Sequence, residues 1–526
     1  MIDFMTYRRK RVRVIYVLFD SLNRHALGCY GGRAVPTPNF DALAARSLVF
    51  DNHYVGSLPC MPARRDMQTG RLNFLHRGWG PLEPFDNAFP EILRGRGVYS
   101  HLITDHYHYF EEGGIGHHGR YSSWEFFRGQ EKDRWKGVVD PPLEHLRAEF
   151  HPSQFDADRG ANSALPYAIT RQYIRTEREF PLAQCFTAAL DFLGTNRAAD
   201  NWFLQIECFD PHEPFFAAER YRAGLETDYQ GPVLDWPRYG RPDYLLAEAA
   251  ELRANYLALL AMCDAHLGRL LAWLDAANAW EDTAIILSTD HGLLLGEREY
   301  WGKNRPPFFN EIVHIPLLLH HPEVAPGRCR ALTQTIDLMP TILDLFDAPV
   351  PGEVRGHSLL ALLAADRPLR PAALFGQFGG ATNITDGRFA WLVYPPPEAP
   401  DPLFHYTLMP MHMRSFFEPA ELAAATLRPP FDFTRGMPVL KVPVLAEAAG
   451  NMRGRYPSLD ARTVLYDLEA DPGQTAPLAA AHAEEARLRD LMAEIMQAHD
   501  APPEAFLRLG AAPPGAPPLP AAGAAS

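Results

Sequence analysis

The sequence contains few cysteines, and no two of them lie close together. Six cysteines are spread over 526 residues without a C-x-x-C motif. This spacing argues against a disulfide-stabilised fold and against a structural zinc site, whose ligands usually come in short-range pairs. We therefore expect most of them to be small buried hydrophobic residues. They are Cys29, Cys60, Cys185, Cys208, Cys263 and Cys329.

Long hydrophobic runs are also missing. No stretch approaches the roughly 20 consecutive apolar residues that a membrane-spanning helix needs. The basic segment at the N-terminus is followed by an apolar run of only about seven residues without a small-residue cleavage site, so we interpret it as a strand and not as a signal peptide. We accordingly predict no membrane association and a cytoplasmic location.

Positive charge is in deficit. The chain has 50 lysines and arginines against 64 aspartates and glutamates, which gives a formal net charge of -14. Such a balance disfavours non-specific binding to nucleic acid, and an anionic substrate would need a locally positive pocket. We expect no nucleic-acid partner. A symmetric homo-oligomer is common for large enzymes and stays open.

What the chain does have is a series of apolar, β-branched segments separated by helical patterns. Buried strands alternating with helices are typical of an α/β fold with a largely parallel central sheet flanked by helices. The expected strands are residues 12–19, 98–104, 202–209, 283–289 and 315–321.

The pattern of expected secondary structure changes near residue 370. We predict a catalytic α/β domain over 12–370 and a smaller antiparallel α+β subdomain over 371–500, with an Asp386-Gly387 turn between two of its strands. The Ala/Pro-rich segment 511–526 is expected to be a disordered tail.

Two expected strands end in residues that can bind a metal ion. Asp20 directly follows the first strand, and Asp290 and His291 follow the fourth. Polar groups at the carboxyl ends of strands in an open α/β sheet gather at one edge, so these three side chains predict an oxygen-and-imidazole metal site. The structural alternative is that each aspartate is an ordinary turn or helix-cap residue.

The segment "SLPCMPARRDMQTG" places Cys60 at the start of an expected helix that Gly70 ends. Pro62 suits the first helical turn, and the positive end of the helix dipole favours a nucleophile or an anion at Cys60. Arg64, one turn later, would point toward the same place. The alternative is a buried cysteine beside an ordinary helix start.

The motif C-x-P-x-R resembles the signature of the type I sulfatases of the alkaline phosphatase superfamily, in which the cysteine is oxidised to formylglycine. The stretches "YVLFDSLNRHALGCYGG", "DPHEPF" and "STDHGLLLGEREYWGK" resemble further blocks of that family, in the same order. The resemblance extends over about residues 12 to 495. It implies hydrolysis of a small anionic sulfate ester and a formylglycine-generating enzyme as maturation partner.

The resemblance also implies roles for individual residues. Arg64 would steady the hydrated aldehyde, while His212 and Lys303 would bind the sulfate group or protonate the leaving oxygen. The ligands of one divalent cation would be Asp20, residue 60, Asp290 and His291. One hydroxyl of the hydrated aldehyde would attack sulfur, and the other would then expel sulfate.

The sequence departs from the family pattern at two places. Many sulfatases have a second acid after the first aspartate, where this chain has Ser21. Calcium is the expected cation, but Ser21 and the imidazole of His291 make manganese an alternative. A "DHYH" segment stands where a lysine-containing block is usual, which makes His106 and His108 candidate substrate contacts or, equally, packing residues.

Two alternatives to a sulfatase follow from these departures. The phosphonate monoester and phosphodiester hydrolases also use formylglycine and lack the second acid, so the chain resembles them as well. The other alternative is a catalytically silent anion-binding homologue in which Cys60 stays a thiol.

The tryptic peptide that runs from Ser47 to Arg64 tests the precursor role of Cys60. In protein made in its native host or together with a formylglycine-generating enzyme, we expect mass spectrometry to show an aldehyde at position 60 that reacts with a carbonyl-trapping reagent. An intact thiol under these conditions would favour the silent homologue.

Overall fold

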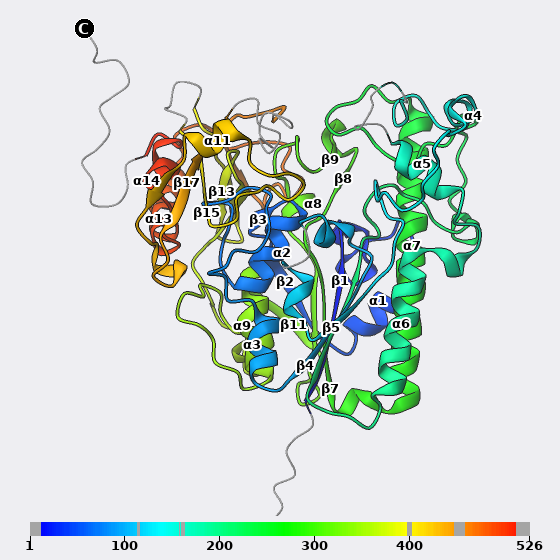
Figure 1. Ribbon diagram of the computed structural model, residues 1–526, viewed down its shortest axis with the longest axis horizontal. Helices are drawn as coiled ribbons and strands as arrows, with labels where there is room; N and C mark the ends of the chain where they lie inside the picture. The colour runs from blue at the N-terminus through cyan, green and yellow to red at the C-terminus, as the bar shows by residue number, and fades with distance from the viewer. Residues whose placement is uncertain are drawn as a thin grey trace, which may run out of the picture.

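The computed structural model describes residues 12–112, 116–156, 158, 164–396, 402–445 and 458–511. The predicted tail lies outside these residues except for its first position, 511. An eight-stranded sheet runs through the centre (Figure 1). Its strands, in spatial order, are β11 (Gly327–Gln334), β2 (Leu48–Tyr54), β10 (Leu317–His320), β7 (Thr283–Thr289), β1 (Arg13–Phe19), β6 (Trp202–Cys208), β4 (Tyr99–Thr104) and β5 (Ser123–Phe126).

The sheet is largely parallel, which confirms the predicted α/β class. All five expected strands are present, but β10 runs antiparallel to both of its neighbours, β2 and β7. The connection from β7 to β10 contains the short hairpin of β8 (Leu294–Leu295) and β9 (Trp301–Gly302) and the four-residue helix α8 (Asn310–Val313). Because it lacks the long crossover helix that joins parallel strands, the chain re-enters the sheet from the edge it left.

Helices cover both faces of the sheet (Figure 1). One layer contains α1 (Pro38–Ala44), α6 (Pro181–Thr195) and α7 (Leu246–Ala277), and the other contains α2 (Cys60–Thr69), α3 (Phe89–Gly95) and α9 (Leu338–Leu345). Alternate residues of β1 enter the two cores: Ile15, Val17 and Phe19 the first, Val14, Tyr16 and Leu18 the second. A strand buried on both faces is apolar throughout, which is why β1 could be predicted from sequence. The remaining α-helices of the described residues are α4 (Leu143–Glu149), α5 (Leu165–Arg171), α10 (Leu360–Ala364), α11 (Pro419–Ala423), α13 (Ala483–Ala498) and α14 (Pro503–Leu507).

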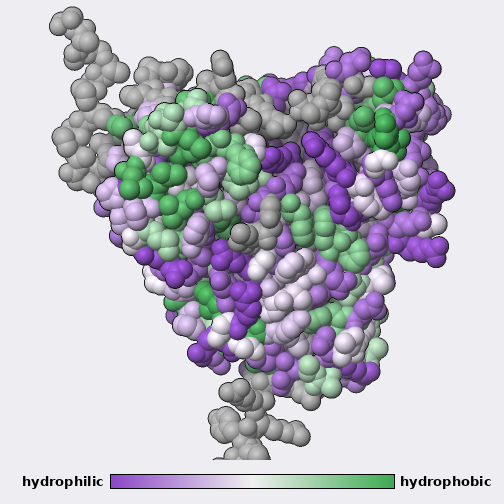
Figure 2. Space-filling view, viewed as in Figure 1, coloured by the Kyte–Doolittle hydropathy of each residue, from purple (hydrophilic) through white to green (hydrophobic). Residues whose placement is uncertain are grey.

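Helix α7 is long and apolar enough to cross a membrane by length and composition alone. However, 61% of its most apolar window is buried inside the protein. It packs against α6 and α1, and polar side chains are interspersed among apolar ones on the side of the molecule where these helices lie (Figure 2). This burial is that of a core helix in a folded domain.

The N-cap residue of α1 does not cap the helix with its side chain. Thr37 is the N-cap residue and Pro38 opens the helix, but the Thr37 hydroxyl accepts a hydrogen bond from Gly28 N at 2.9 Å. The free helix N–H groups of Asn39 and Phe40 donate instead to Asp264 on α7, both at 2.9 Å. The cap is therefore tertiary, which single-sequence reasoning cannot detect.

A second, five-stranded sheet lies at the C-terminal side of the molecule. Its order is β18 (Val464–Asp467), β14 (Phe389–Leu392), β13 (Thr382–Thr385), β12 (Ala373–Gln377) and β3 (Ser57–Leu58). The predicted Asp386-Gly387 turn joins β13 to β14, with Gly387 at φ 93°. Strand β3 comes from far earlier in the chain and pairs in parallel with β12. The smaller sheet therefore includes a strand from the predicted catalytic domain, and the exact boundary at residue 370 stays a prediction.

A third sheet, of β15 (Phe404–Thr407), β17 (Val439–Pro443) and β16 (Thr426–Arg428), completes the C-terminal part. His76, in the segment that follows α2, links this part to the main domain. Its Nε2 donates to the carbonyl oxygen of Asp500 at 2.8 Å, and its ring contacts Phe431 and Phe433. Burial lowers the pKa of His76 to about 3.

This buried histidine predicts acid sensitivity. In the unfolded state His76 takes up a proton near pH 6.5, but in the folded state only near pH 3. Its protonation therefore does not reduce the free energy of unfolding above about pH 6.5. Between about pH 6.5 and 3 the free energy of unfolding falls by about 1.4 kcal/mol per pH unit. His76→Gln keeps a donor but does not titrate. We expect a correspondingly shallower loss of the free energy of unfolding, measured by urea denaturation between about pH 7 and 4.

The control for this experiment is His145→Gln, whose side chain is 68% exposed. It should leave the slope of stability against pH unchanged. Identical slopes for the wild type and His76→Gln would contradict the prediction.

Candidate active site

Two carboxylates meet at the carboxyl edge of the main sheet. Strands β1 and β7 pair in parallel with Phe19 opposite Thr289, so the residues that follow them, Asp20 and Asp290, lie side by side. The Ser21 and His291 N–H groups both donate to Asp290 Oδ1, at 3.1 and 2.8 Å. Ser21 adopts a positive φ of 59° at this turn. The parallel pairing thus brings together two acids that are 270 residues apart in sequence, as predicted.

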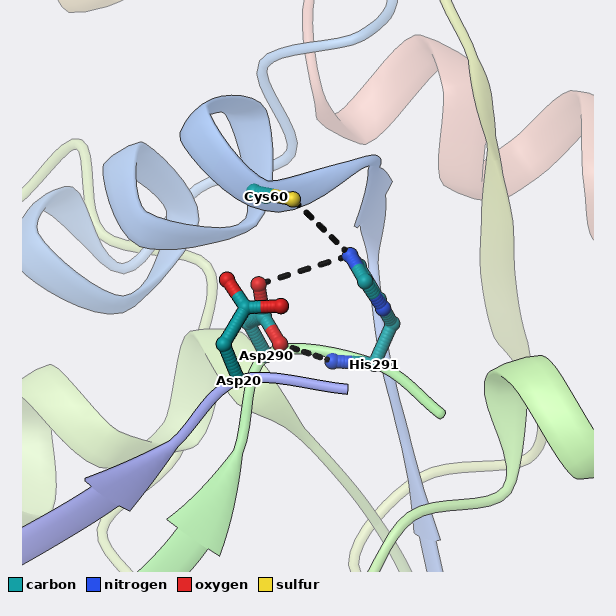
Figure 3. Close-up of side chains that lie close together, drawn as sticks. All are labelled: Asp20, Cys60, Asp290 and His291. Carbon is teal, nitrogen blue, oxygen red and sulfur yellow. Dashed lines mark hydrogen bonds and ion pairs between the residues drawn. The ribbon is translucent and has the colours of Figure 1, made fainter. Parts of the chain in front are cut away.

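Cys60 completes the cluster from the first residue of α2 (Figure 3). Its Sγ lies 3.2 Å from His291 Nε2. One ligand atom from each of Asp20, Cys60, Asp290 and His291 can be chosen so that all lie within 4.8 Å of one another, and all four residues are buried. The four predicted metal ligands are therefore neighbours in space.

The imidazole of His291 is prepared to act as a ligand. Its Nδ1 lies 3.0 Å from the carbonyl oxygen of Gly292, which can only accept, so we assign the proton to Nδ1. Nε2, which faces Cys60 and Asp290, then carries the lone pair. Burial lowers the pKa of His291 to about 4, so the ring is neutral at physiological pH.

The donor set fits a divalent cation. Among the described residues, Asp20 Oδ2 is a buried oxygen that accepts no hydrogen bond, although Arg64 Nη2 approaches it to 3.0 Å. Burial would raise the pKa of Asp20, but Lys303 and Arg64 hold it well below its ordinary value. An ionised, incompletely satisfied carboxylate beside a neutral imidazole is what a Ca²⁺ or Mn²⁺ site provides.

Lys303 extends over the cluster from the end of the β8–β9 hairpin. Its ammonium donates to Ser21 Oγ at 2.8 Å and lies 3.5 Å from Cys60 Sγ. Burial opposes its charge, yet nearby carboxylates, among them Asp20, raise the pKa of Lys303, so it stays protonated. The positive charge of Lys303 therefore lies beside residue 60.

Arg64 is buried among three carboxylates. Its Nε donates to Glu207 at 2.6 Å and its Nη1 to Asp290 at 2.5 Å, while Nη2 faces Asp20. Nη1 also donates to the carbonyl oxygen of Cys60 at 3.2 Å. The contacts of Arg64 are therefore with the acids and the backbone of residue 60.

The pKa of the Cys60 thiol is not lowered, although a position at a helix N-terminus was expected to favour an anion. Burial and the negative charge of Asp20 raise the pKa of Cys60 well above its ordinary value, against the opposing effect of Lys303. The side chain is therefore a neutral thiol at physiological pH and a poor thiolate nucleophile. A precursor role is compatible with this environment.

The predicted histidines occupy different parts of the site. His106 Nε2 lies 3.4 Å from Asp20 Oδ2, and His212 donates from Nδ1 to the carbonyl oxygen of Glu213 at 2.5 Å. His212 is among the groups whose electrostatic influence lowers the pKa of Asp20, so it lies near the cluster. His108 instead pairs with Glu111 and Arg414, at 2.7 and 3.0 Å.

Sequence reasoning missed Glu207 and Tyr239. Glu207 is an acid inside the apolar strand β6, a signal that could have been noticed because buried carboxylates need a partner. Tyr239 donates to Glu213 from a loop. Its position has no sequence signal, since only the fold brings the loop to the site.

Comparisons with known proteins agree with this geometry. Residues 13–348 match the model of the sulfatase family. The chain belongs to this family, which is part of the alkaline phosphatase superfamily.

Individual relatives are distant. A multifunctional alkaline phosphatase superfamily protein, PehA of Trinickia caryophylli, is 27% identical over 63% of this chain and 72% of its own length. Choline-sulfatase of Rhizobium meliloti is 25% identical over 63% of this chain and 67% of its own.

The fold is shared with solved structures. A phosphonate monoester hydrolase of Agrobacterium radiobacter has a TM-score of 0.62 at 20% identity, covering 93% of this chain and 96% of its own. A protein bound to its substrate D-glucosamine-2-N,6-O-disulfate has a TM-score of 0.63 at 17% identity, covering 94% and 99%. These likenesses establish the fold.

Asp20→Asn tests the metal site directly. Removing the ionised, incompletely satisfied oxygen should weaken binding of Mn²⁺ or Ca²⁺ by about 100-fold, because a neutral amide replaces a negatively charged ligand. Titration calorimetry on chelator-treated protein measures this. Asp105→Asn, another buried acid at the end of a strand of the same sheet, β4, is the control and should bind within a few-fold of the wild type. Equal affinities for wild type and Asp20→Asn would exclude Asp20 as a ligand.

Proposed function

We propose that the protein hydrolyses a sulfate monoester through a formylglycine made from Cys60, with one divalent cation held by Asp20, Asp290, His291 and residue 60. The observation that carries this proposal is the position of Cys60. It begins α2 within 3.2 Å of His291 and 3.5 Å of Lys303, inside a buried group of ligand-type side chains. Family membership supports the same chemistry.

We assign a separate role to each group of side chains. When bound, the cation would polarise the ester oxygens and lower the pKa of the nucleophile. Lys303 offsets the negative charge of the ester at residue 60. Arg64, bonded to the carbonyl oxygen of residue 60, fixes the first turn of α2 against the acids.

Proton transfer needs a group on the leaving-oxygen side. His212 is held through Nδ1 by the Glu213 carbonyl, which leaves Nε2 to serve the substrate. A hydrated aldehyde at residue 60 would supply two hydroxyls. One would form the bond to sulfur as the alcohol leaves with a proton, and the other would lose its proton as the carbon–oxygen bond to the sulfate group breaks and the aldehyde returns.

A second candidate is hydrolysis of phosphonate monoesters or phosphodiesters by the same residues. Ser21 favours it, because these hydrolases lack the second acid that many sulfatases have, and here the Ser21 hydroxyl binds Lys303 and Asp20 instead. The relative PehA is described as multifunctional, which supports more than one activity for this site. These substrates carry one negative charge, as sulfate monoesters do.

A rate comparison separates the two. We expect kcat/KM for p-nitrophenyl sulfate to equal or exceed that for p-nitrophenyl phenylphosphonate and for bis-p-nitrophenyl phosphate. A sulfate rate about 100-fold below the others, a transition-state difference of about 2.7 kcal/mol, would make the second candidate the function.

Cys60→Ala should abolish turnover of all three substrates, by about 1000-fold or more, since it removes the nucleophile. Cys29→Ala, at a partly exposed cysteine outside the cluster, is the matched control and should keep the wild-type rate. Full activity in Cys60→Ala would contradict both candidates. The cytoplasmic location, the maturation enzyme and the oligomeric state stay predictions.

A further inference from the structure

Glu207 is an acid in the interior of the main sheet. It lies on β6 opposite Leu18 of β1 and Thr104 of β4, and it is completely buried. A carboxylate at such a position is retained only with a compensating charge or several hydrogen bonds. Glu207 has both.

The compensating charge is that of Arg64. The contact between Arg64 Nε and Glu207 Oε1 is 2.6 Å long, and Glu207 Oε2 accepts from Tyr109 at 2.9 Å and from Gln205 at 2.7 Å. The two remaining nitrogens of Arg64 face Asp290 and Asp20. Glu207 is therefore the one carboxylate of the three around Arg64 that lies outside the proposed ligand set.

We propose that Glu207 is a positioning residue that sets the cation affinity of the site through Arg64. This inference rests on the proposed cation site. Glu207 binds the Nε side of the guanidinium and compensates its charge, so that Arg64 draws less on Asp20 and Asp290. Without the Glu207 charge, the positive charge of Arg64 would be balanced by the two proposed ligands alone, and it would compete with the cation for them.

A merely structural role makes a different prediction. If Glu207 only packs and accepts hydrogen bonds from Tyr109 and Gln205, then Gln at this position, which has the same size and keeps an acceptor oxygen, should leave cation binding unchanged. If its charge acts through Arg64, then Glu207→Gln should lower the cation affinity strongly, and this effect should depend on the presence of Arg64. The two readings therefore differ in a measurable coupling.

The experiment is titration calorimetry of the full chain, freed of metal by a chelator, with MnCl2 and with CaCl2. We expect Glu207→Gln to weaken binding by about 10- to 100-fold. In an Arg64→Met background the same change should cost less than about 3-fold, because the competing charge is gone. Tyr109→Phe, which removes one hydrogen bond to Glu207 and leaves its charge, is the matched control and should stay within about 3-fold.

The outcomes are distinguishable. Glu207→Gln with wild-type affinity, or with an equal loss in both backgrounds, overturns the inference while the cation site stands. A wild type that binds neither ion overturns the cation site and the inference with it. Circular dichroism and thermal melting verify that each variant is folded.

If Glu207→Gln does not fold, Glu207→Asp carries the test. It withdraws the carboxylate from Arg64 Nε while keeping its charge. We expect about 3- to 10-fold weaker binding, and unchanged affinity overturns the inference.

Discussion

Three carboxylates and two positively charged side chains are buried together, and this charge cluster is the constraint on which the site depends. Asp20, Asp290 and Glu207 would repel one another strongly in a medium of low polarity. Arg64 contacts all three, and Lys303 lies 3.6 Å from Asp20. Removing one member of such a network exposes the others to an uncompensated buried charge, so the side chains hold one another in place. With all five ionised, the group has a net charge of -1, which suits the arrival of a divalent cation.

The sheet supplies the geometry that the charges require. Parallel pairing of β1 with β7 and β6 brings together Asp20 and Asp290, which follow β1 and β7, and Glu207 near the end of β6. Arg64 and residue 60 come from α2, whose start is fixed by strand β3 in the smaller sheet, with Gly376 opposite Ser57 and Gln377 opposite Leu58. The C-terminal part is thus joined by backbone hydrogen bonds to the segment that carries the predicted nucleophile. A change in the smaller sheet would be transmitted to residue 60 through only the single residue that separates β3 from α2.

Membership of the sulfatase family indicates hydrolysis of esters, and the charges of this site bear on which esters suit it. Ser21 and the neutral ring of His291 replace charge that a more acidic cage would hold, and the pKa of the Cys60 thiol is raised by burial. Together these features favour a neutral precursor side chain and a monoanionic ester.

The sequence by itself determined the fold class, the strands that end in Asp20 and Asp290, and the motif at Cys60. These features are local: an apolar run, a residue directly after it, or a short spacing carries each signal, and the family pattern supplies their order. Only the tertiary structure decided that β3 joins the C-terminal sheet, that α1 is capped by Asp264 on α7, that β10 runs antiparallel, and that Glu207 binds Arg64. Each of these depends on contacts between residues far apart in the chain, whose free energy comes from pairing and burial that no local pattern records.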